Sequence, residues 1–138
     1  MKPPKMGDVF IYDYLWFWQH DAGETEGRKP RPTALVATVV DTGGKTNLFI
    51  LAITSTAPPS DRQALEVPQI ERRRAGLEDD KKLWIMLDEY NHDILEGSFY
   101  FNSANCIGQF SETFYKLAFQ AFMNIVRTKR TKQVKRTE

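Results

Sequence analysis

Two apolar runs separated by a short glycine-containing turn constrain the fold of this chain more than any other feature. Residues 34–40 and 48–53 are rich in Val, Ile, Leu and Ala, and residues 41–45 between them contain Gly43 and Gly44. Glycine accepts the positive φ that a tight turn between two strands requires. The pattern therefore predicts an antiparallel hairpin.

Further short runs predict additional strands. Residues 9–14 are aromatic and β-branched and predict a first strand, which Leu15, Trp16, Phe17 and Trp18 would extend, while the Gly, Pro and charged residues of 19–32 predict a long loop. Shorter strands are expected at 65–67, 83–87, 98–101 and 105–107, with one helical turn at 70–76.

One longer helix is predicted over residues 111–126. Ser111 is a favourable N-cap, and apolar residues from Phe114 to Ile125 recur at helical spacing. A second apolar stripe widens the buried face, which either fills the core or meets a second subunit. Many short strands without βαβ alternation predict a mainly β fold, a small antiparallel barrel or rolled sheet followed by this helix.

Length and charge predict one domain followed by a basic C-terminal segment. The chain has 138 residues, which predicts a single domain over 1–126. Residues 127–138 carry six basic side chains and one acidic one, so the other 126 residues hold 13 Lys and Arg against 17 Asp and Glu. We expect 127–138 to be a disordered basic tail. Because the rest of the chain is acidic, any phosphate site must be local.

Composition also bears on the cellular compartment and on whether the protein needs a metal or cofactor. Cys106 is the only cysteine, residues 1–5 lead into no apolar signal segment, and no apolar stretch is long enough to span a membrane, so we expect a cytoplasmic protein without membrane contact. His20 and His92 lack further ligands at metal-binding spacing. We predict no metal and no cofactor.

A rigid cationic loop is the main candidate for chemistry. Arg28, Lys29 and Arg31 are framed by prolines and accompanied by Glu24 and Glu26. A guanidinium fork on a stiff backbone matches phosphate oxygens and loses little entropy on binding. The alternative is a solvated loop whose Glu and Arg residues pair with one another.

Two weaker candidates lie at strand ends. Thr54 and Ser55 follow an apolar strand and offer hydroxyl donors in a cleft, although Thr and Ser are also common turn residues. Asp88 and Glu89 follow residues 83–87, where a carboxylate beside an apolar strand can have a raised pKa and act as a general base. A solvated turn acid is the alternative for this pair.

Three motifs, in order, resemble the PemK/MazF family of toxin endoribonucleases. They are Gly7-Asp8-Val9, then Lys29-Pro30-Arg31-Pro32 opening a strand after Glu26-Gly27-Arg28, then Thr54-Ser55 closing a strand. The likeness covers residues 7–126. Pro58-Pro59, Gly76-Leu77 and residues 83–91 are similar to a PemK-like branch of this family.

The resemblance implies an SH3-like antiparallel barrel with a C-terminal helix, forming a homodimer. It also implies a growth inhibitor that cleaves single-stranded RNA at short sequences without metal and is neutralised by a cognate antitoxin. Cleavage by 2′-OH attack requires a proton acceptor, stabilisation of the phosphorane and protonation of the leaving oxygen.

The resemblance assigns roles to individual residues. Arg31 stabilises the phosphorane and donates a proton, and Thr54 bonds a phosphate oxygen. The base is Glu26, Asp88 or Glu24, in that order of preference. RNA binding falls to the following residues: Arg28, Lys29, Ser55, Trp16, Trp18 and Glu24. The aromatic members of this set would stack on unpaired bases.

An alternative function remains. Many family members have a basic residue where this chain has Asn91, and residues 15–20 lengthen the first loop. A catalytically inactive PemK-like barrel that binds nucleic acid or a protein partner is therefore the second hypothesis. A DNA-binding regulator has little support, because no recognition helix is evident.

Overall fold

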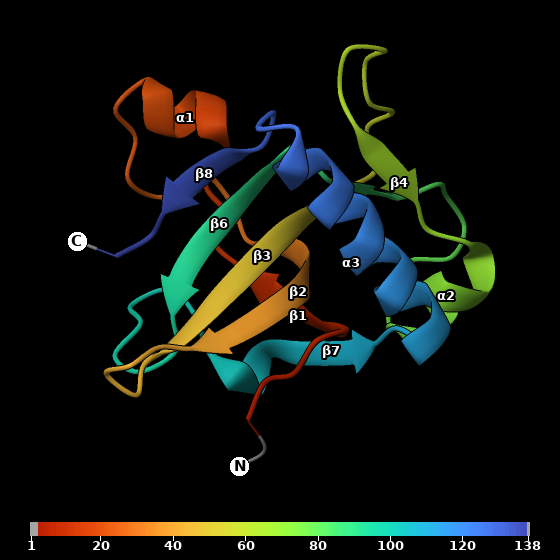
Figure 1. Cartoon of the computed structure of the whole chain (residues 1–138). Coiled ribbons are helices and arrows are strands. Elements are labelled where there is room, and N and C mark those ends of the chain that lie inside the picture. Colours follow the sequence, from red (N-terminus) through yellow and green to blue (C-terminus); the bar gives the residue numbers. More distant parts are fainter. Residues whose placement is uncertain (1–2, 138) are drawn as a thin grey trace.

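The computed structural model describes residues 3–137 and is mainly β (Figure 1). Eight strands belong to one sheet, in which the path β4-β5-β3-β2-β1-β7 does not close into a ring within the described residues. β6 branches from β3, and β8 pairs with β6. The elements in chain order are β1 (Asp8–Tyr12), α1 (Phe17–Asp21), β2 (Arg31–Val40), β3 (Thr46–Thr54), β4 (Ala64–Glu66), α2 (Gln69–Arg74), β5 (Trp84–Met86), β6 (Glu89–Ile94), a 3-10 turn (Ser103–Asn105), β7 (Cys106–Gln109), α3 (Glu112–Arg127) and β8 (Lys132–Lys135).

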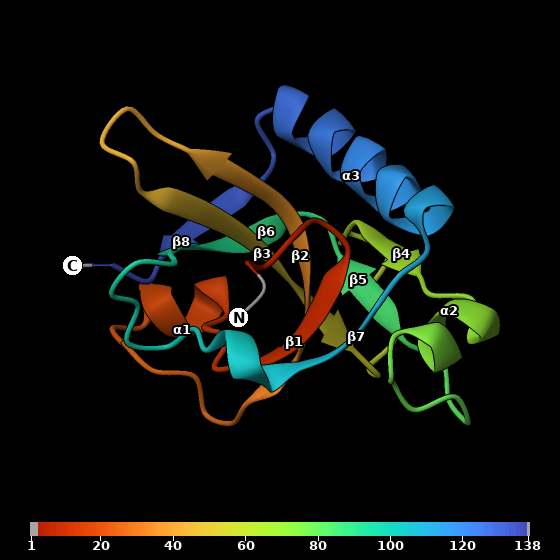
Figure 2. The same cartoon turned by 90° about the horizontal axis from the view of Figure 1, so that it is seen from below.

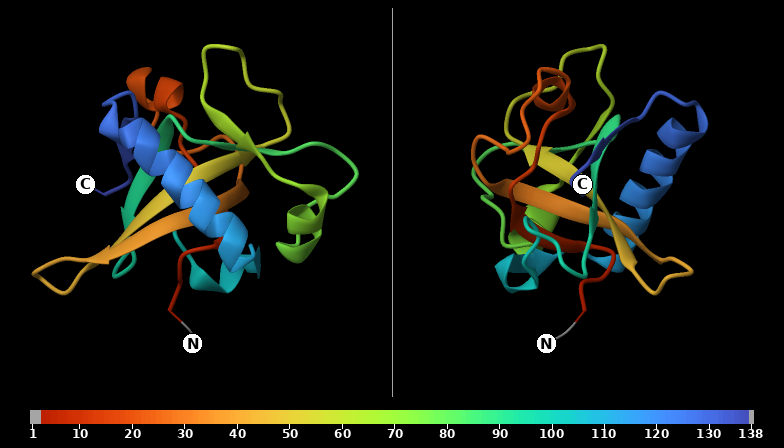
Figure 3. Two further views of the ribbon diagram at one scale, coloured as in Figure 1. Left: turned by 45° about the vertical axis from the view of Figure 1, so that its right-hand side comes forward. Right: turned by 90° about the vertical axis from the view of Figure 1, so that its left-hand side faces the viewer.

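The predicted hairpin is present as β2 and β3, which pair antiparallel and project beyond the rest of the sheet (Figure 3). Asp41 shapes its turn, because Oδ1 accepts hydrogen bonds from the backbone N–H of Lys45 at 3.0 Å and of Gly43 at 2.9 Å. Gly44 has a φ of 81°, which a residue with a side chain rarely adopts. The turn residues therefore set the register of the two central strands.

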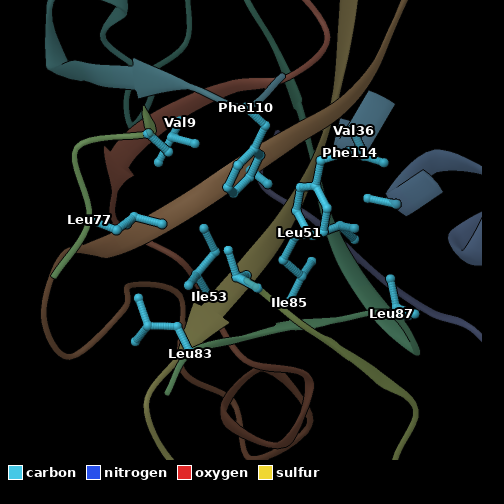
Figure 4. Close-up of a cluster of buried hydrophobic side chains, with 14 of the residues drawn as sticks. Val9, Val36, Leu51, Ile53, Leu77, Leu83, Ile85, Leu87, Phe110 and Phe114 are labelled. Carbon is cyan, nitrogen blue, oxygen red and sulfur yellow. The ribbon is translucent and has the colours of Figure 1, made fainter. Parts of the chain in front are cut away.

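Helix α3 covers one face of the sheet and α1 lies on the other side (Figure 2). The α3 side packs Phe110, Phe114, Ala118 and Phe122 against apolar residues of the strands, several of which are drawn in Figure 4. The N-cap prediction is confirmed, because Ser111 Oγ accepts the Phe114 N–H at 3.2 Å. The second apolar stripe of α3 packs largely against this same core.

The Gly7-Asp8 step brings α3 onto the first strand. Gly7 has a φ of 95°, and a Cβ at this position would clash with the ring of Tyr115 on α3. Its carbonyl accepts the N–H of Phe110 at 2.9 Å. Gly7 therefore lets the N-terminal end of β1 and the start of α3 approach closely.

Two local predictions are wrong. Residues 98–101 form no strand: Ser98 Oγ accepts the N–H groups of Tyr100 and Phe101, and the Phe101 ring packs 4.8 Å from that of Phe10. Residues 17 and 18 do not extend the first strand but begin α1, because the Gln19 side chain accepts the Trp16 N–H at 2.9 Å and starts a helix.

The prediction of a disordered tail over 127–138 is also wrong for residues 127–137, and Glu138 lies outside the described residues. β8 pairs in parallel with β6, so that the end of the described chain lies beside the sheet and near α1 (Figures 1 and 2). Val134 and Arg136 are buried there. The basic composition hid this strand, because its anchoring residue is itself a cation that finds polar partners inside the protein.

Candidate functional site

Arg31 is the first residue of β2, and one N–H group of its guanidinium has no hydrogen-bond acceptor within the described residues. Its Nε is buried and has no partner within residues 3–137, and the guanidinium carbon lies 5.0 Å from the centre of the Trp16 ring. Loss of water around this half-buried side chain lowers the pKa of Arg31, and Tyr14 acts in the opposite direction. Arg31 is thus a charged group held against an aromatic ring, with a donor still available.

Thr54 is the last residue of β3, at the end of the hairpin where Arg31 begins β2. The β2–β3 pairing runs as far as Thr33 opposite Ala52, two residues short of Arg31 and of Thr54. Side chains two residues apart on a strand point to the same face, so Arg31 and Thr54 lie on the face of this pair. Opposite residues of an antiparallel pair lie on the same face. Thr54 Oγ1 accepts the Thr56 N–H at 3.1 Å, which leaves its hydroxyl proton to donate, and Ser55 is exposed beside it.

A buried carboxylate, that of Glu89, begins β6. Glu89 is 3% exposed, and its Oε2 accepts hydrogen bonds from the Tyr14 hydroxyl at 3.1 Å and from the Phe17 N–H at 2.9 Å. Its Oε1 forms an ion pair of 3.0 Å with Arg62. Burial raises the pKa of Glu89, against the combined effect of these partners. Burial also raises the pKa of Tyr14 well above its usual value, so that Tyr14 remains a donor.

Asp88 is tied to the same arginine. Arg62 donates from Nε and Nη2 to its two oxygens at 2.8 Å each, and the Gln63 N–H adds a bond of 3.2 Å. Asp88 lies at the break between β5 and β6, which share the edge of β3. The pair therefore fixes a strand junction, and both carboxylate oxygens are engaged.

Two residues of the cationic loop pair with each other, which agrees with the alternative of a solvated loop. Glu24 and Arg28 form an exposed ion pair of 3.1 Å, and the Arg28 guanidinium lies 4.7 Å from the centre of the Trp18 ring. Lys29 is exposed. Glu26 is exposed as well, and it makes no hydrogen bond or ion pair within residues 3–137. Of the three predicted bases, Glu26 is the one with an unoccupied carboxylate in this part of the chain.

Each of the aromatic residues 16–18 has its ring against a different cationic side chain. Trp16 faces Arg31, Trp18 faces Arg28 and is 52% exposed, and Lys132 of β8 lies 5.1 Å from the centre of the Phe17 ring. The structure thus brings Trp16 together with Arg31, and Trp18 with Arg28. Asp88 lies in a different group, with Arg62 and Glu89.

Sequence reasoning missed a buried polar layer on β6. Glu89, Asn91 and Asp93 alternate inward and are buried, whereas an ordinary strand would place apolar residues there. Asn91 bonds the backbone N–H and carbonyl of Leu15 at 2.9 and 2.7 Å. Asp93 accepts from the Tyr12 hydroxyl at 2.8 Å. The alternation of Glu89, Asn91 and Asp93 was visible in the sequence, but nothing in it indicated that the polar set faces inward.

Arg136 completes this layer from the end of the chain. Its Nη1 donates to the Asp13 carbonyl and to Asn91 Oδ1, and its guanidinium lies 3.8 Å from the centre of the Tyr100 ring. Tyr12, Asn91, Asp93 and Arg136 were not predicted as a group. Their positions in the sequence are too far apart for any spacing rule to connect them.

A cavity of about 740 Å³ lies beside the cationic loop. Glu24 and Glu26 line it together with Asp93, Tyr100 and Arg136, among others. The loop that ends in Arg31 therefore also forms one wall of this cavity.

Residues 3–137 contain no cluster of His, Cys, Asp or Glu suited to a metal ion. None of the helices in this part of the chain has the length and apolarity to cross a membrane. No protein-family model and no curated protein sequence matches the chain.

Proposed function

We propose that this protein is a toxin-type endoribonuclease of the PemK/MazF kind that cleaves single-stranded RNA by 2′-OH attack without metal. The proposal includes a more specific fold, an SH3-like barrel. Support comes from the ordered motifs of the sequence, together with one structural observation: Arg31 and Thr54 each lie two residues beyond the pair Thr33–Ala52, on the same face of the β2–β3 hairpin.

The proposed reaction uses three side chains. Glu26 takes the proton of the 2′-OH as its oxygen attacks phosphorus, and the bond from phosphorus to the 5′-oxygen breaks to leave a 2′,3′-cyclic phosphate. Arg31 stabilises the negative phosphorane and gives the 5′-oxygen its proton. The lowered pKa of Arg31 supports this second role, because loss of water makes the guanidinium a better acid than it is in solution. Thr54 donates to a phosphate oxygen.

The proposed RNA contacts come from residues near Arg31 and Thr54 in the sequence. Trp16 and Trp18 offer ring faces to unpaired bases, and Arg28 and Lys29 neutralise phosphates. Ser55 and Glu24 supply polar contacts to the strand. Glu89 and Tyr14 act as positioning residues, since Glu89 has its oxygens engaged and touches the reacting atoms only through its neighbours.

The test is cleavage of a mixed single-stranded RNA in excess EDTA. We expect discrete fragments with the wild-type protein and a loss of about 10²–10³-fold in rate with Arg31→Ala or Thr54→Ala. Arg73→Ala is the matched control, because this exposed arginine of α2 pairs with Asp79 and should leave cleavage unchanged. Equal rates for Arg31→Ala and Arg73→Ala would contradict the mechanism.

A second candidate is an inactive PemK-like barrel that binds nucleic acid or a protein partner. It is favoured by the engaged state of Asp88 and Glu24, which leaves Glu26 alone as an open base among the three. RNA binding without cleavage would support this candidate.

Partners follow from the same proposal: a second copy of the chain and a cognate antitoxin. Induction in a bacterial host should arrest growth for the wild-type protein and not for Arg31→Ala. Growth arrest by both forms would point to sequestration instead of cleavage.

A further inference from the structure

The cavity beside the cationic loop has a lining of mixed charge that suits neither a simple anion nor a simple cation. Its walls include Glu24, Lys45, Phe99 and Lys135. A bare phosphate would be repelled by the carboxylates, and a cation by the lysines. The lining instead matches a ligand that combines a ring, hydrogen-bond donors and a negative group, as a nucleotide does.

Among the carboxylates that line the cavity, Glu24 is the one that can replace its present partner by a ligand with several hydrogen-bond donors. Asp93 accepts from Tyr12, Ser98 and the Ile94 N–H, and Glu96 accepts from the N–H and hydroxyl of Thr46. Glu24 has only its exposed ion pair with Arg28, which is weak in water. Glu26, the remaining one, is assigned to the proton transfer above.

An exposed aromatic ring lies at the same cavity. Phe99 is 86% exposed, and its ring centre is 5.1 Å from that of Tyr100 in an edge-to-face arrangement. Tyr100 is fixed in turn by the Arg136 guanidinium at 3.8 Å. The Phe99 ring is apolar and exposed, and it packs on a Tyr100 ring that is itself held in place. An unpaired nucleobase can stack on such a ring.

We propose that this cavity binds a guanine base of an RNA strand, stacked on Phe99 with its N1–H and N2–H₂ edge donating to the Glu24 carboxylate. Guanine alone among the four bases presents two adjacent donor groups that a carboxylate accepts together. Lys45 and Lys135 attract the neighbouring phosphates. The assignment rests on the proposed function for the choice of RNA, and it adds the base that the enzyme selects.

The cavity is close to the proposed reaction site along the chain. Glu26 lines the cavity and Arg31 lies five residues later, a span of at most about 18 Å when fully extended. One RNA strand therefore reaches both. The recognised guanine should lie at a fixed, short distance from the cleaved bond.

Binding can be measured without cleavage by using 2′-O-methyl RNA, which lacks the attacking hydroxyl. The probes are UUGUU and the matched UUAUU, with guanosine monophosphate as a third ligand, titrated calorimetrically into the full chain. We expect UUGUU to bind about tenfold more tightly than UUAUU, as for one bidentate contact to a base edge. Glu24→Gln should abolish this preference, and Phe99→Ala should weaken both pentamers.

The controls are Glu66→Gln, an exposed carboxylate of β4, and Ile70→Ala, an exposed apolar residue of α2. Both should bind like the wild-type protein. Equal affinity for the two pentamers, or a preference that survives Glu24→Gln, would overturn the proposal. Guanosine monophosphate binding as tightly as UUGUU would replace the RNA strand by a free nucleotide and overturn it as well.

Failure of the two proposals can be told apart. Selective binding of UUGUU without cleavage of unmodified RNA would keep the guanine site and remove the nuclease. Cleavage of unmodified RNA with no guanine at a fixed distance would keep the nuclease and remove the site.

Discussion

Arg136 donates a hydrogen bond of 3.1 Å to Oδ1 of Asn91, which joins the residue that follows β8 to the neighbouring strand β6. The same Asn91 oxygen accepts the Leu15 N–H, so three segments meet at one buried amide. The C-terminal strand is therefore part of the fold that supports the candidate site.

Arg136→Ala should destabilise the protein. It removes donors to Asn91 and to the Asp13 carbonyl as well as the contact with Tyr100, at a cost of about 2–4 kcal/mol in the free energy of unfolding. Urea denaturation monitored by circular dichroism measures this cost. Lys135→Ala, an exposed neighbour, should change the unfolding free energy by less than about 0.5 kcal/mol. Equal effects of the two substitutions would show that Arg136 is not an anchor.

Arg62→Ala should leave Glu89 as a buried charge without its ion-pair partner. We expect a loss of about 3 kcal/mol in the free energy of unfolding at neutral pH. The double variant Arg62→Ala/Glu89→Gln should recover part of it, since the uncompensated charge is then gone. Chemical denaturation of the four proteins of this cycle gives the coupling energy. A coupling energy near zero would contradict the buried network.

Glu89 should make stability depend on pH in a defined direction. Because its pKa is raised in the folded protein, its contribution to stability is fully present below the unfolded pKa and is lost as pH rises through the folded value. The wild-type protein should therefore lose stability relative to Glu89→Gln as pH rises from about 4 toward 7. Thermal unfolding of both proteins across this range provides the measurement. A difference that stays constant or moves the other way would contradict the raised pKa.

Trp16 should hold the Arg31 guanidinium in position for the proposed reaction. Trp16→Ala is expected to lower kcat for RNA cleavage by about tenfold, whereas Trp16→Phe, which keeps a ring over the cation, should retain most of the rate. Steady-state kinetics separate this effect from a change in KM. A change confined to KM would show that Trp16 binds RNA without positioning Arg31.

The local patterns were sufficient for the central part of the fold. The β2–β3 hairpin follows from Asp41 and two glycines, and α3 follows from Ser111 and the spacing of apolar residues. Both elements form from neighbouring residues, so their signals are local. Arg31 and Thr54 were assigned from the family resemblance, and the structure places them at the ends of β2 and β3.

The remaining elements depend on contacts between distant residues. β6 places Glu89, Asn91 and Asp93 inward, and each is stabilised by a partner far away in the sequence, such as Tyr14, Leu15 or Tyr12. β8 depends on Arg136 reaching the Asp13 carbonyl. Composition and periodicity assign such polar residues to the surface, so the sequence predicted neither strand.

The most direct measurement is the chemical analysis of RNA product ends after incubation with the wild-type protein in excess EDTA. We expect 2′,3′-cyclic phosphate on one fragment and a free 5′-OH on the other, and no product when 2′-O-methyl RNA is used. Products with 5′-phosphate ends, or cleavage of the 2′-O-methyl strand, would contradict this expectation.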